Sequence, residues 1–344
     1  MANALIDAYV PLLGWIGAGI LLFRLLPQDF PRLLGRSLYW VGVPLEILAL
    51  TRRTQLSGSS SLVPAITAAT LLTGFGIAWV VLKFVQWWEV PTTQQADLKN
   101  QITAELPFLP PNSSQGSIWH KPACQGGFLL SSVLGNTGFM GLAIVPVFVG
   151  DAALDWVVFY GVTQNIVGTY GLGVLLSSYY GRAVEGRPWW QPLQDVATVP
   201  SLWACALGFS TQAVPLPAIA ETALQRSIWV VIPAAFLLIG LRLSQLRGLQ
   251  SLKGAVLPTL LKVIILPALI GIGGLWLGIS DDSLLTLVLM AGMPTAFAAL
   301  ILAEEYELDR EMVTSSILLT TLVLLVMIPV WLFCFGDIAA IANS

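Results

Sequence analysis

The chain has 344 residues, of which 56% are hydrophobic and 10% are charged. Soluble domains carry about a quarter charged residues, so this composition excludes a soluble protein and predicts an all-α polytopic membrane protein. Sixteen Lys and Arg against 19 Asp and Glu give a net charge of −3, which argues against nucleic acid as a partner, because nucleic-acid-binding surfaces are basic.

Runs of about 20 apolar residues predict ten transmembrane helices, because such runs match the hydrocarbon thickness of a bilayer. The runs lie near residues 5–26, 33–51, 62–87, 123–150, 154–180, 196–214, 220–243, 254–278, 283–305 and 311–335. The sixth run is short and ends at Pro215 and Pro217, so a count of nine stays open. The first run is expected to be retained, since the residues before it lack the basic region of a cleaved signal peptide.

The connection between the third and fourth runs, residues 88–126, is rich in Pro, Asn, Ser and Gly. This composition is typical of a loop and predicts a polar cytoplasmic connector. Within it, residues 93–106 carry apolar side chains at helical spacing, which favours a short surface helix.

Basic residues predict the orientation of the chain. With the N-terminus outside, twelve of the 16 Lys and Arg fall on the inner side and three on the outer side, while Lys262 is the only one away from the end of a run. Inner loops of membrane proteins carry the excess of positive charge. We therefore expect an integral protein of the plasma (inner) membrane with both termini outside.

Two of the runs are interrupted in the middle, at residues 134–146 and 290–306. The first contains Gly-Asn-Thr-Gly, and the second contains Gly-Met-Pro-Thr. Gly and Pro interrupt the helical ladder, and the freed backbone groups then need partners in protein or at a water-filled cavity. Two broken segments at matching places in two halves are typical of the binding site of a secondary transporter.

The two halves show weak internal symmetry. Setting Gly138 against Pro294 also places Asp155 opposite Glu311. A repeat with an odd number of spans inverts its partner across the membrane. The expected units are therefore two inverted five-helix repeats, residues 1–180 and 181–344.

Three motifs resemble those of the auxin efflux carrier family of permeases. Residues 134–142 read Leu-Gly-Asn-Thr-Gly-Phe-Met-Gly-Leu and resemble its fourth-span motif. Residues 293–306 read Met-Pro-Thr-Ala-Phe-Ala-Ala-Leu-Ile-Leu-Ala-Glu-Glu-Tyr and resemble its ninth-span motif, and residues 39–44 resemble its second-span motif. The agreement extends over almost the whole chain and suggests a prokaryotic-type member.

The resemblance implies crossed, discontinuous fourth and ninth helices and a scaffold made of helices one, two, six and seven. It also implies export or exchange of small organic anions, such as indole acetate in plants and dicarboxylates in bacteria. The family usually has proline where this chain has Ala143, and the next proline here is Pro146. The break in the first half is therefore expected to be displaced toward Pro146, whereas Pro294 marks the break in the second half.

The candidate substrate-binding residues are polar or lie at the breaks. They are Asn136, Thr137, Gly138, Gly141, Met293, Pro294, Thr295, Gln164 and Asn165. An amide inside the bilayer is unfavourable unless it is paired, and a half-helix N-terminus suits an anion. The alternatives are that Asn136 pairs freed carbonyls, that Thr295 bonds to its own helix, and that Gln164 and Asn165 join neighbouring helices.

Glu46 and Lys262 are candidates for support of the site or for coupling. An ionisable residue within the membrane is a functional candidate by default. The alternatives are that Glu46 and Lys262 pair with each other, that Lys262 snorkels to the inner surface, and that Glu46 lies at the outer interface beside Arg52. The acidic residues between 304 and 311 are expected to cap the start of the tenth helix rather than to bind a metal.

These observations predict a secondary active transporter that moves a small organic anion across the lipid bilayer by alternating access, without a cofactor. A sodium-coupled organic-acid or bile-acid-type symporter and a membrane receptor remain alternatives. An enzyme is not expected, because His120 is the single histidine and no GxSxG or Walker A motif is present. Widely spaced cysteines suggest neither a disulfide framework nor a zinc site. Homodimer contacts through the scaffold are a further expectation.

Overall fold

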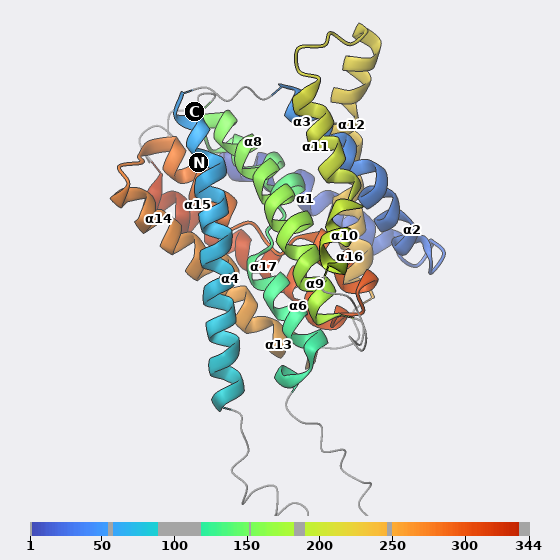
Figure 1. Cartoon of the computed structure of the whole chain (residues 1–344), viewed down its shortest axis with the longest axis vertical. Helices are drawn as coiled ribbons and strands as arrows, with labels where there is room; N and C mark the ends of the chain where they lie inside the picture. Colours follow the sequence, from blue (N-terminus) through green and yellow to red (C-terminus); the bar gives the residue numbers. More distant parts are fainter. Residues whose placement is uncertain are drawn as a thin grey trace, which may run out of the picture.

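The computed structural model describes residues 2–53, 58–88, 118–150, 153–181, 190–245 and 250–336. Over these ranges the chain is helical, with no strand beyond one isolated backbone bridge (Figure 1). This agrees with the expected all-α polytopic membrane protein. The surface helix expected at 93–106 lies outside the described residues.

The first half contains long helices interrupted by π-helical and 3₁₀ turns, which are labelled η. Its elements are α1 (Ala2–Leu22), α2 (Phe30–Ser37), η1 (Leu38–Gly42), α3 (Val43–Arg53), η2 (Gly58–Leu62), α4 (Val63–Trp88), η3 (Ile118–His120), α6 (Pro122–Val133), η4 (Thr137–Gly141), α7 (Leu142–Ile144), η5 (Val145–Val147), α8 (Leu154–Thr163), η7 (Gln164–Gly173) and α9 (Val174–Tyr180).

The second half also contains long helices, with one clear gap. Its elements are α10 (Gln191–Ala197), α11 (Pro200–Ser210), α12 (Ala218–Leu243), α13 (Gln250–Thr259), η8 (Leu260–Ile265), α14 (Leu266–Trp276), α15 (Asp281–Ala291), α16 (Phe297–Glu305) and α17 (Arg310–Phe335).

Among the described residues, five helices are long and apolar enough to cross a membrane without interruption. They are Phe30–Arg52, Ser60–Trp88, Ala218–Leu243, Leu252–Trp276 and Arg310–Phe335. The segments that contain α6 and α15 fail this length criterion because each stops near its middle. The interruptions expected from Gly and Pro are thus present as real gaps in the helices.

The helices pack in two groups. In the first group α1 packs on α12 and α3 packs on α11 and α12. An added Cβ at Gly19 would collide with the carbonyl oxygen of Leu237, and one at Gly240 would collide with that of Ile16. Small residues let these two backbones meet, as is common between membrane helices. The second group contains α4, α6, α8, α13, α14, α15 and α17 (Figure 1).

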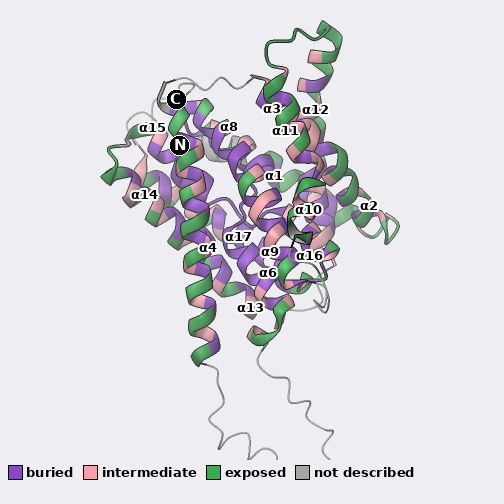
Figure 2. Ribbon diagram, viewed as in Figure 1, coloured by how far each residue is buried: buried purple, intermediate pink, exposed green. Residues whose placement is uncertain are grey.

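The broken segments lie at the centre of the molecule. Residues 126–141 and 284–297 are buried without exception, whereas α4 and α12 present apolar side chains such as Trp79 and Trp229 outward (Figure 2). A helix that is buried on every side belongs to the core of a bundle. The side chains at the two breaks therefore face protein, whereas the outer helices present apolar side chains outward.

Candidate functional site

The two breaks lie side by side and are joined through their backbones. Gly135 and Thr295 form an antiparallel bridge. The Asn136 N–H donates to the Pro294 carbonyl over 2.7 Å, and the Ala296 N–H donates to the Leu134 carbonyl over 2.8 Å. Each break thus supplies partners for backbone groups that the other has freed, as the low dielectric of a membrane requires.

The sequence explains where each helix stops and restarts. Pro294 has no N–H to continue the ladder of α15, which ends at Ala291. In the first half α6 ends at Val133, and the Asn136 carbonyl then accepts from the N–H groups of Met140 and Gly141 over 3.1 and 3.0 Å. Asn136 therefore begins a new half-helix.

This position corrects the expectation for the first break. The gap lies at Leu134–Asn136, whereas Ala143 is inside α7 and Pro146 is in the terminal turn η5. The break is not displaced toward Pro146, because Gly135 and the paired backbone of the second half already hold an extended segment there. A proline at position 143 is not needed for the interruption.

One side of the breaks is closed by hydrogen bonds from Thr295 and Thr320. The Thr295 hydroxyl donates to the Ser131 carbonyl over 2.8 Å, and the Thr295 N–H donates to the Thr320 hydroxyl over 3.0 Å. Both threonines are buried. They satisfy groups at the end of α6 and at the gap after α15, so the hydroxyl of Thr295 is bonded across the crossing and not to its own helix.

Lys262 closes the same side. Its ammonium donates to the Ala291 carbonyl at the end of α15, and its side chain is 1% exposed. A Cβ added to Gly135 would lie 3.0 Å from Lys262 Nζ. The lysine therefore lies against both breaks and does not snorkel to a surface. A cation at a helix C-terminus is favourable because the terminal carbonyls are partly negative.

The breaks also border a cavity of ≈ 20 Å³, which Lys262 does not line and which is called the Glu46 side below. This volume is enough for about one water molecule. Side chains from four elements meet there. The cavity is lined by Val43, Glu46, Gly135, Asn136, Gly138, Phe139, Asn165, Tyr170, Ala296, Phe297 and Ala298.

Polar groups on this side lack partners among the described residues. Both carboxylate oxygens of Glu46 and Asn136 Nδ2 are buried without a hydrogen bond, as is Oγ1 of Thr137, a neighbouring residue that does not line the cavity. Buried polar groups are normally paired, so each exception needs an explanation. Asn136 does not use its amide nitrogen to pair carbonyls of the break, which leaves that nitrogen available to a ligand.

Gly138 allows this polar group to assemble. A Cβ at this position would lie 2.8 Å from Asn165 Nδ2 and 3.6 Å from Glu46 Oε2. The absent side chain thus leaves the space in which Asn165 and Glu46 approach the first break. Glu46 is 1% exposed and does not lie at an outer interface.

The remaining predicted residues have packing contacts. A Cβ at Gly141 would lie 2.8 Å from the sulfur of Met290 and 3.5 Å from Met293, so Gly141 allows close packing on α15. Gln164 Nε2 instead donates a hydrogen bond over 3.5 Å to the carbonyl of Val133, which joins η7 to the end of α6. A direct role for these residues in substrate binding stays a prediction.

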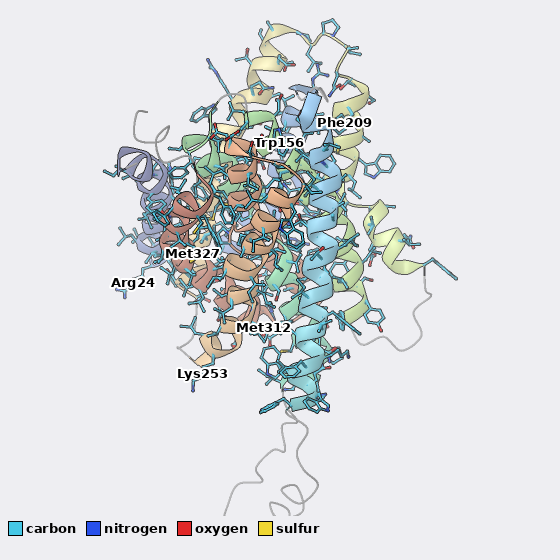
Figure 3. The ribbon with its side chains drawn as sticks, turned by 90° about the vertical axis from the view of Figure 1, so that its left-hand side faces the viewer. Arg24, Trp156, Phe209, Lys253, Met312 and Met327 are labelled. Atoms are coloured by element: carbon cyan, nitrogen blue, oxygen red, sulfur yellow. The ribbon has the colours of Figure 1, made fainter. Side chains whose placement is uncertain are left out.

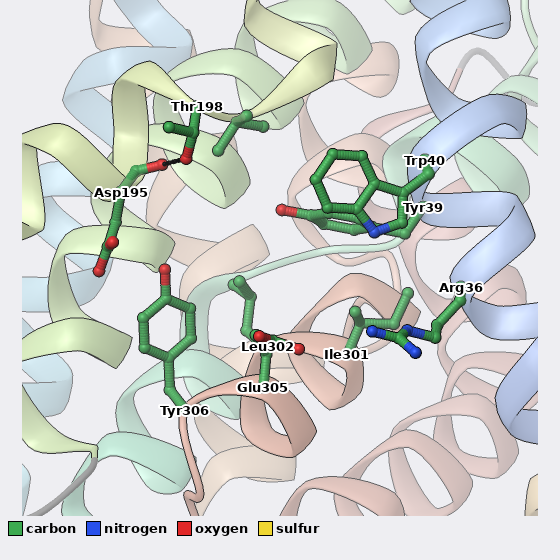
Figure 4. A pocket seen from close by; sticks show the side chains of 10 residues that line it. Arg36, Tyr39, Trp40, Asp195, Thr198, Ile301, Leu302, Glu305 and Tyr306 are labelled. Atoms are coloured by element: carbon green, nitrogen blue, oxygen red, sulfur yellow. Dashed lines mark hydrogen bonds between the residues drawn. The ribbon is translucent and has the colours of Figure 1, made fainter.

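A second cavity of ≈ 180 Å³ lies between α2 and η1, α10 and α16. Arg36 and Glu305 lie at one side of it, and Tyr306 points toward Asp195 (Figure 4). Tyr39 lines this cavity, and its ring centroid lies 5.8 Å from that of Tyr170, which lines the small cavity. The two tyrosines therefore stand between the two cavities.

The two tyrosines were not among the predicted site residues. Tyr39 lies in the second-span motif seven residues before Glu46, a spacing that places both on one face of a helix. That spacing was the signal available in the sequence. Tyr170 lies in an apolar run with no comparable pattern.

The acidic residues after α16 have separate roles. Asp309 caps α17 by accepting from the Met312 N–H over 3.0 Å, as expected for this group. Glu304 instead forms an ion pair with Arg242 over 2.8 Å, which joins α16 to the end of α12. This pair links the second broken segment to the group of helices that contains α1 and α3.

The known proteins that this chain resembles are described as membrane transport proteins or transporters. The family described as membrane transport protein matches residues 193–332. An uncharacterized transporter of Methanothermobacter thermautotrophicus is 30% identical over 206 residues, which cover 60% of this chain and 66% of that protein. An uncharacterized transporter of Methanocaldococcus jannaschii is 28% identical over 218 residues, covering 60% and 67%. The chain thus spans just under two thirds of the first relative's length and about two thirds of the second's.

Proposed function

We propose that this chain, which resembles the auxin efflux carrier family of permeases and is similar to membrane transport proteins, is a transporter that moves a small organic anion by alternating access. The observation that carries this proposal is the pairing of two broken helices beside buried, unpartnered polar groups. Such groups destabilise a protein unless something binds to them. Broken helices at the centre of a bundle form the substrate sites of many secondary carriers.

The chemistry of this side of the breaks suits a carboxylate. Asn136 Nδ2 is a free donor, and η4 and α16 both begin at the breaks. The first N–H groups of a helix have no partner within it and favour negative charge. The two half-helices, one from each half of the chain, thus direct N–H donors at one small volume. These donors favour a carboxylate over a neutral or cationic ligand.

The helix contacts support a proposed architecture of ten spans in two inverted repeats. A twofold relation between the halves would relate α1 to α11 and α3 to α12. The contact between α1 and α12 would then have its counterpart in the contact between α11 and α3, and both contacts are present. In the same way, the contact between α6 and α17 has its counterpart in that between α15 and α8. The contact between α4 and α8 has its counterpart in that between α13 and α17. A twofold relation between halves predicts such matched pairs, and unrelated halves would not.

The orientation of the chain in the inner membrane is also proposed. Lys253 lies toward the end where α4 finishes, and Phe209 and Trp156 lie toward the opposite end (Figure 3). Lys83 is in the last part of α4. The basic residues assigned to inner loops favour the cytoplasmic side for this end, with both termini outside. The larger cavity beside Arg36 then belongs to the cytoplasmic access route.

Counterflow in proteoliposomes tests the proposed function. Vesicles loaded with unlabelled malate or indole acetate are diluted into the labelled compound, and uptake by exchange is measured. We expect Asn136→Ala to reduce exchange by at least about tenfold, the effect of losing one strong polar contact. A matched control is Gln86→Ala, which removes another buried amide, one that donates to the Trp119 carbonyl.

The outcomes separate the candidate functions. Exchange by the wild type and by Gln86→Ala, but not by Asn136→Ala, supports the proposal. Binding without exchange would favour the receptor alternative. Equal exchange by Asn136→Ala and the wild type would contradict the assignment of the site.

A further inference from the structure

The most unusual group beside the breaks is the carboxylate of Glu46. It lies on α3, in the group of helices that contains α1 and α12, and its side chain is 1% exposed. Neither of its oxygens has a hydrogen-bond partner, and no Lys or Arg lies within ion-pair distance among the described residues. Lys262 is bonded to Ala291 on the other side of the breaks. A buried acid without a partner is too unfavourable to be retained for stability alone.

The surroundings of Glu46 are uncharged, with two amides and one tyrosine among mainly apolar residues. Asn165 comes from η7, and Asn136 comes from the first break. Tyr170, also from η7, is the other titratable side chain among the residues that line the cavity, while the lining residues of η4 and α16 are not titratable. The ≈ 20 Å³ of the cavity matches one water or one small ion.

The position of Glu46 creates an electrostatic conflict with the proposed substrate. The carboxylate of an anion bound by Asn136 and the half-helix N-termini would lie beside the Glu46 carboxylate, since Asn136 and Glu46 line the same cavity. Like charges at short distance in a low dielectric repel strongly. The conflict disappears if one positive charge binds at Glu46 together with the anion.

We propose that Glu46 is the coupling site of this carrier, where one monovalent cation, a proton or an alkali-metal ion, binds together with the organic anion. Asn136 and Asn165 supply the neutral oxygens beside the carboxylate. The proposal rests on the function proposed above and adds the identity of the coupling group. Because linkage is reciprocal, the cation raises the affinity for the anion by the same factor as the anion raises the affinity for the cation.

The location of Glu46 favours coupling over simple support. Glu46 belongs to the first group of helices, whereas the breaks belong to the second. A cation that bridges Glu46 and Asn136 joins the two groups when the site is loaded. Movement of the breaks relative to α3 would then separate Asn136 from Glu46. The cation would lose one of its partners, so its release is coupled to release of the anion.

The test measures anion affinity of the purified, full-length protein as a function of cation. Malate and indole acetate are titrated at fixed pH with sodium, potassium or choline chloride, and at fixed sodium over a range of pH. We expect the wild type to bind at least about tenfold more tightly when the coupling cation is present, which is within the usual range for linked sites. Dependence on pH alone identifies a proton, and dependence on sodium or potassium at fixed pH identifies a metal ion.

Variants at Glu46 make the assignment specific. Glu46→Gln removes the charge of the side chain and keeps its shape. The ratio of the anion affinity with the cation to that without it should therefore fall to about one, the value for unlinked sites. Glu46→Asp keeps the charge and should retain part of the dependence. Glu221→Gln is the control, since Glu221 pairs with Arg52 far from the breaks and should keep the wild-type ratio.

Each result has a single consequence. A wild-type affinity that responds to no cation or pH overturns the inference while leaving the anion carrier intact. The inference is also overturned if Glu46→Gln keeps the wild-type ratio of anion affinities with and without the cation. Failure of the wild type to bind or exchange any anion would instead count against the proposed function.

Discussion

The two sides of the crossed breaks differ in how their polar groups are used. On the Lys262 side, formed by Ser131, Lys262, Thr295 and Thr320, hydrogen bonds join the backbone ends of both halves, and among these four side chains the Ser131 hydroxyl lacks a partner. On the Glu46 side, formed by Glu46, Asn136, Gly138 and Asn165, donors and acceptors border a small cavity and several have no partner. One side holds the breaks together, and the other is available to a ligand.

This difference teaches how a membrane protein can keep a broken helix. The first side satisfies the groups that Gly and Pro have freed, so the breaks persist without a ligand. The second side can then keep unsatisfied groups for function. Changes on the Lys262 side should therefore reduce stability, and changes on the Glu46 side should reduce binding.

The largest expected effect is that of Gly138→Val on the Glu46 side. The new side chain would occupy the space where Asn165 and Glu46 approach, since even a Cβ would lie 2.8 Å from Asn165 Nδ2. We expect exchange of the anion to fall by about a hundredfold, as for the loss of two polar contacts. Counterflow measures it, with folding monitored by gel filtration, and near-normal exchange would break the assignment of this side.

Thr320→Val tests the Lys262 side. It leaves the buried N–H of Thr295 without an acceptor, which costs about 2 kcal/mol. We expect a lower melting temperature in detergent, with Thr320→Ser close to the wild type because it keeps the hydroxyl. An unchanged melting temperature for the valine variant would show that this bond does not support the break.

Thr295→Val should have a smaller effect on the same side. It removes the bond from the Thr295 hydroxyl to the Ser131 carbonyl, and hydrogen bonds between membrane helices contribute about 1 kcal/mol. The melting temperature reports this loss, and Thr295→Ser serves as the control. If the variant lost anion binding at an unchanged melting temperature, Thr295 would belong to the ligand side.

Asn165→Ala should have the smallest effect on stability, within about 0.5 kcal/mol, because it trims a partly exposed side chain at the edge of a cavity. Its anion affinity should fall severalfold. A thermal-shift titration gives both quantities from one sample. A large loss of stability without a change in affinity would reverse the roles of the two sides.

The sequence predicted the elements of this site better than their arrangement. Gly135, Asn136 and Pro294 marked the two breaks, because the effects of these residues on a helix are local. The chain could not show that Gly135 would pair with Thr295, since that contact joins residues 160 positions apart. Ala143 and Pro146 misled for a related reason: the backbone of the second half, and not a proline, holds the first break open.

The charged residues illustrate the same limit. Glu46 and Lys262 stood out as ionisable residues in apolar runs, but their separation to opposite sides of the breaks depends on tertiary packing. Tyr39 and Tyr170 gave no strong signal, because aromatic residues are common in membrane helices. Their importance follows from their position between two cavities.

The most direct test of the account is substrate protection of a single cysteine on each side of the breaks, in a background without Cys124, Cys205 and Cys334. Ala298→Cys lines the small cavity, and Ser131→Cys lies on the Lys262 side. We predict that a small thiol reagent labels Cys at position 298 and that the transported anion slows this reaction, while position 131 stays unreactive. Labelling at position 298 that the anion does not change, or anion-sensitive labelling at position 131, would contradict the account.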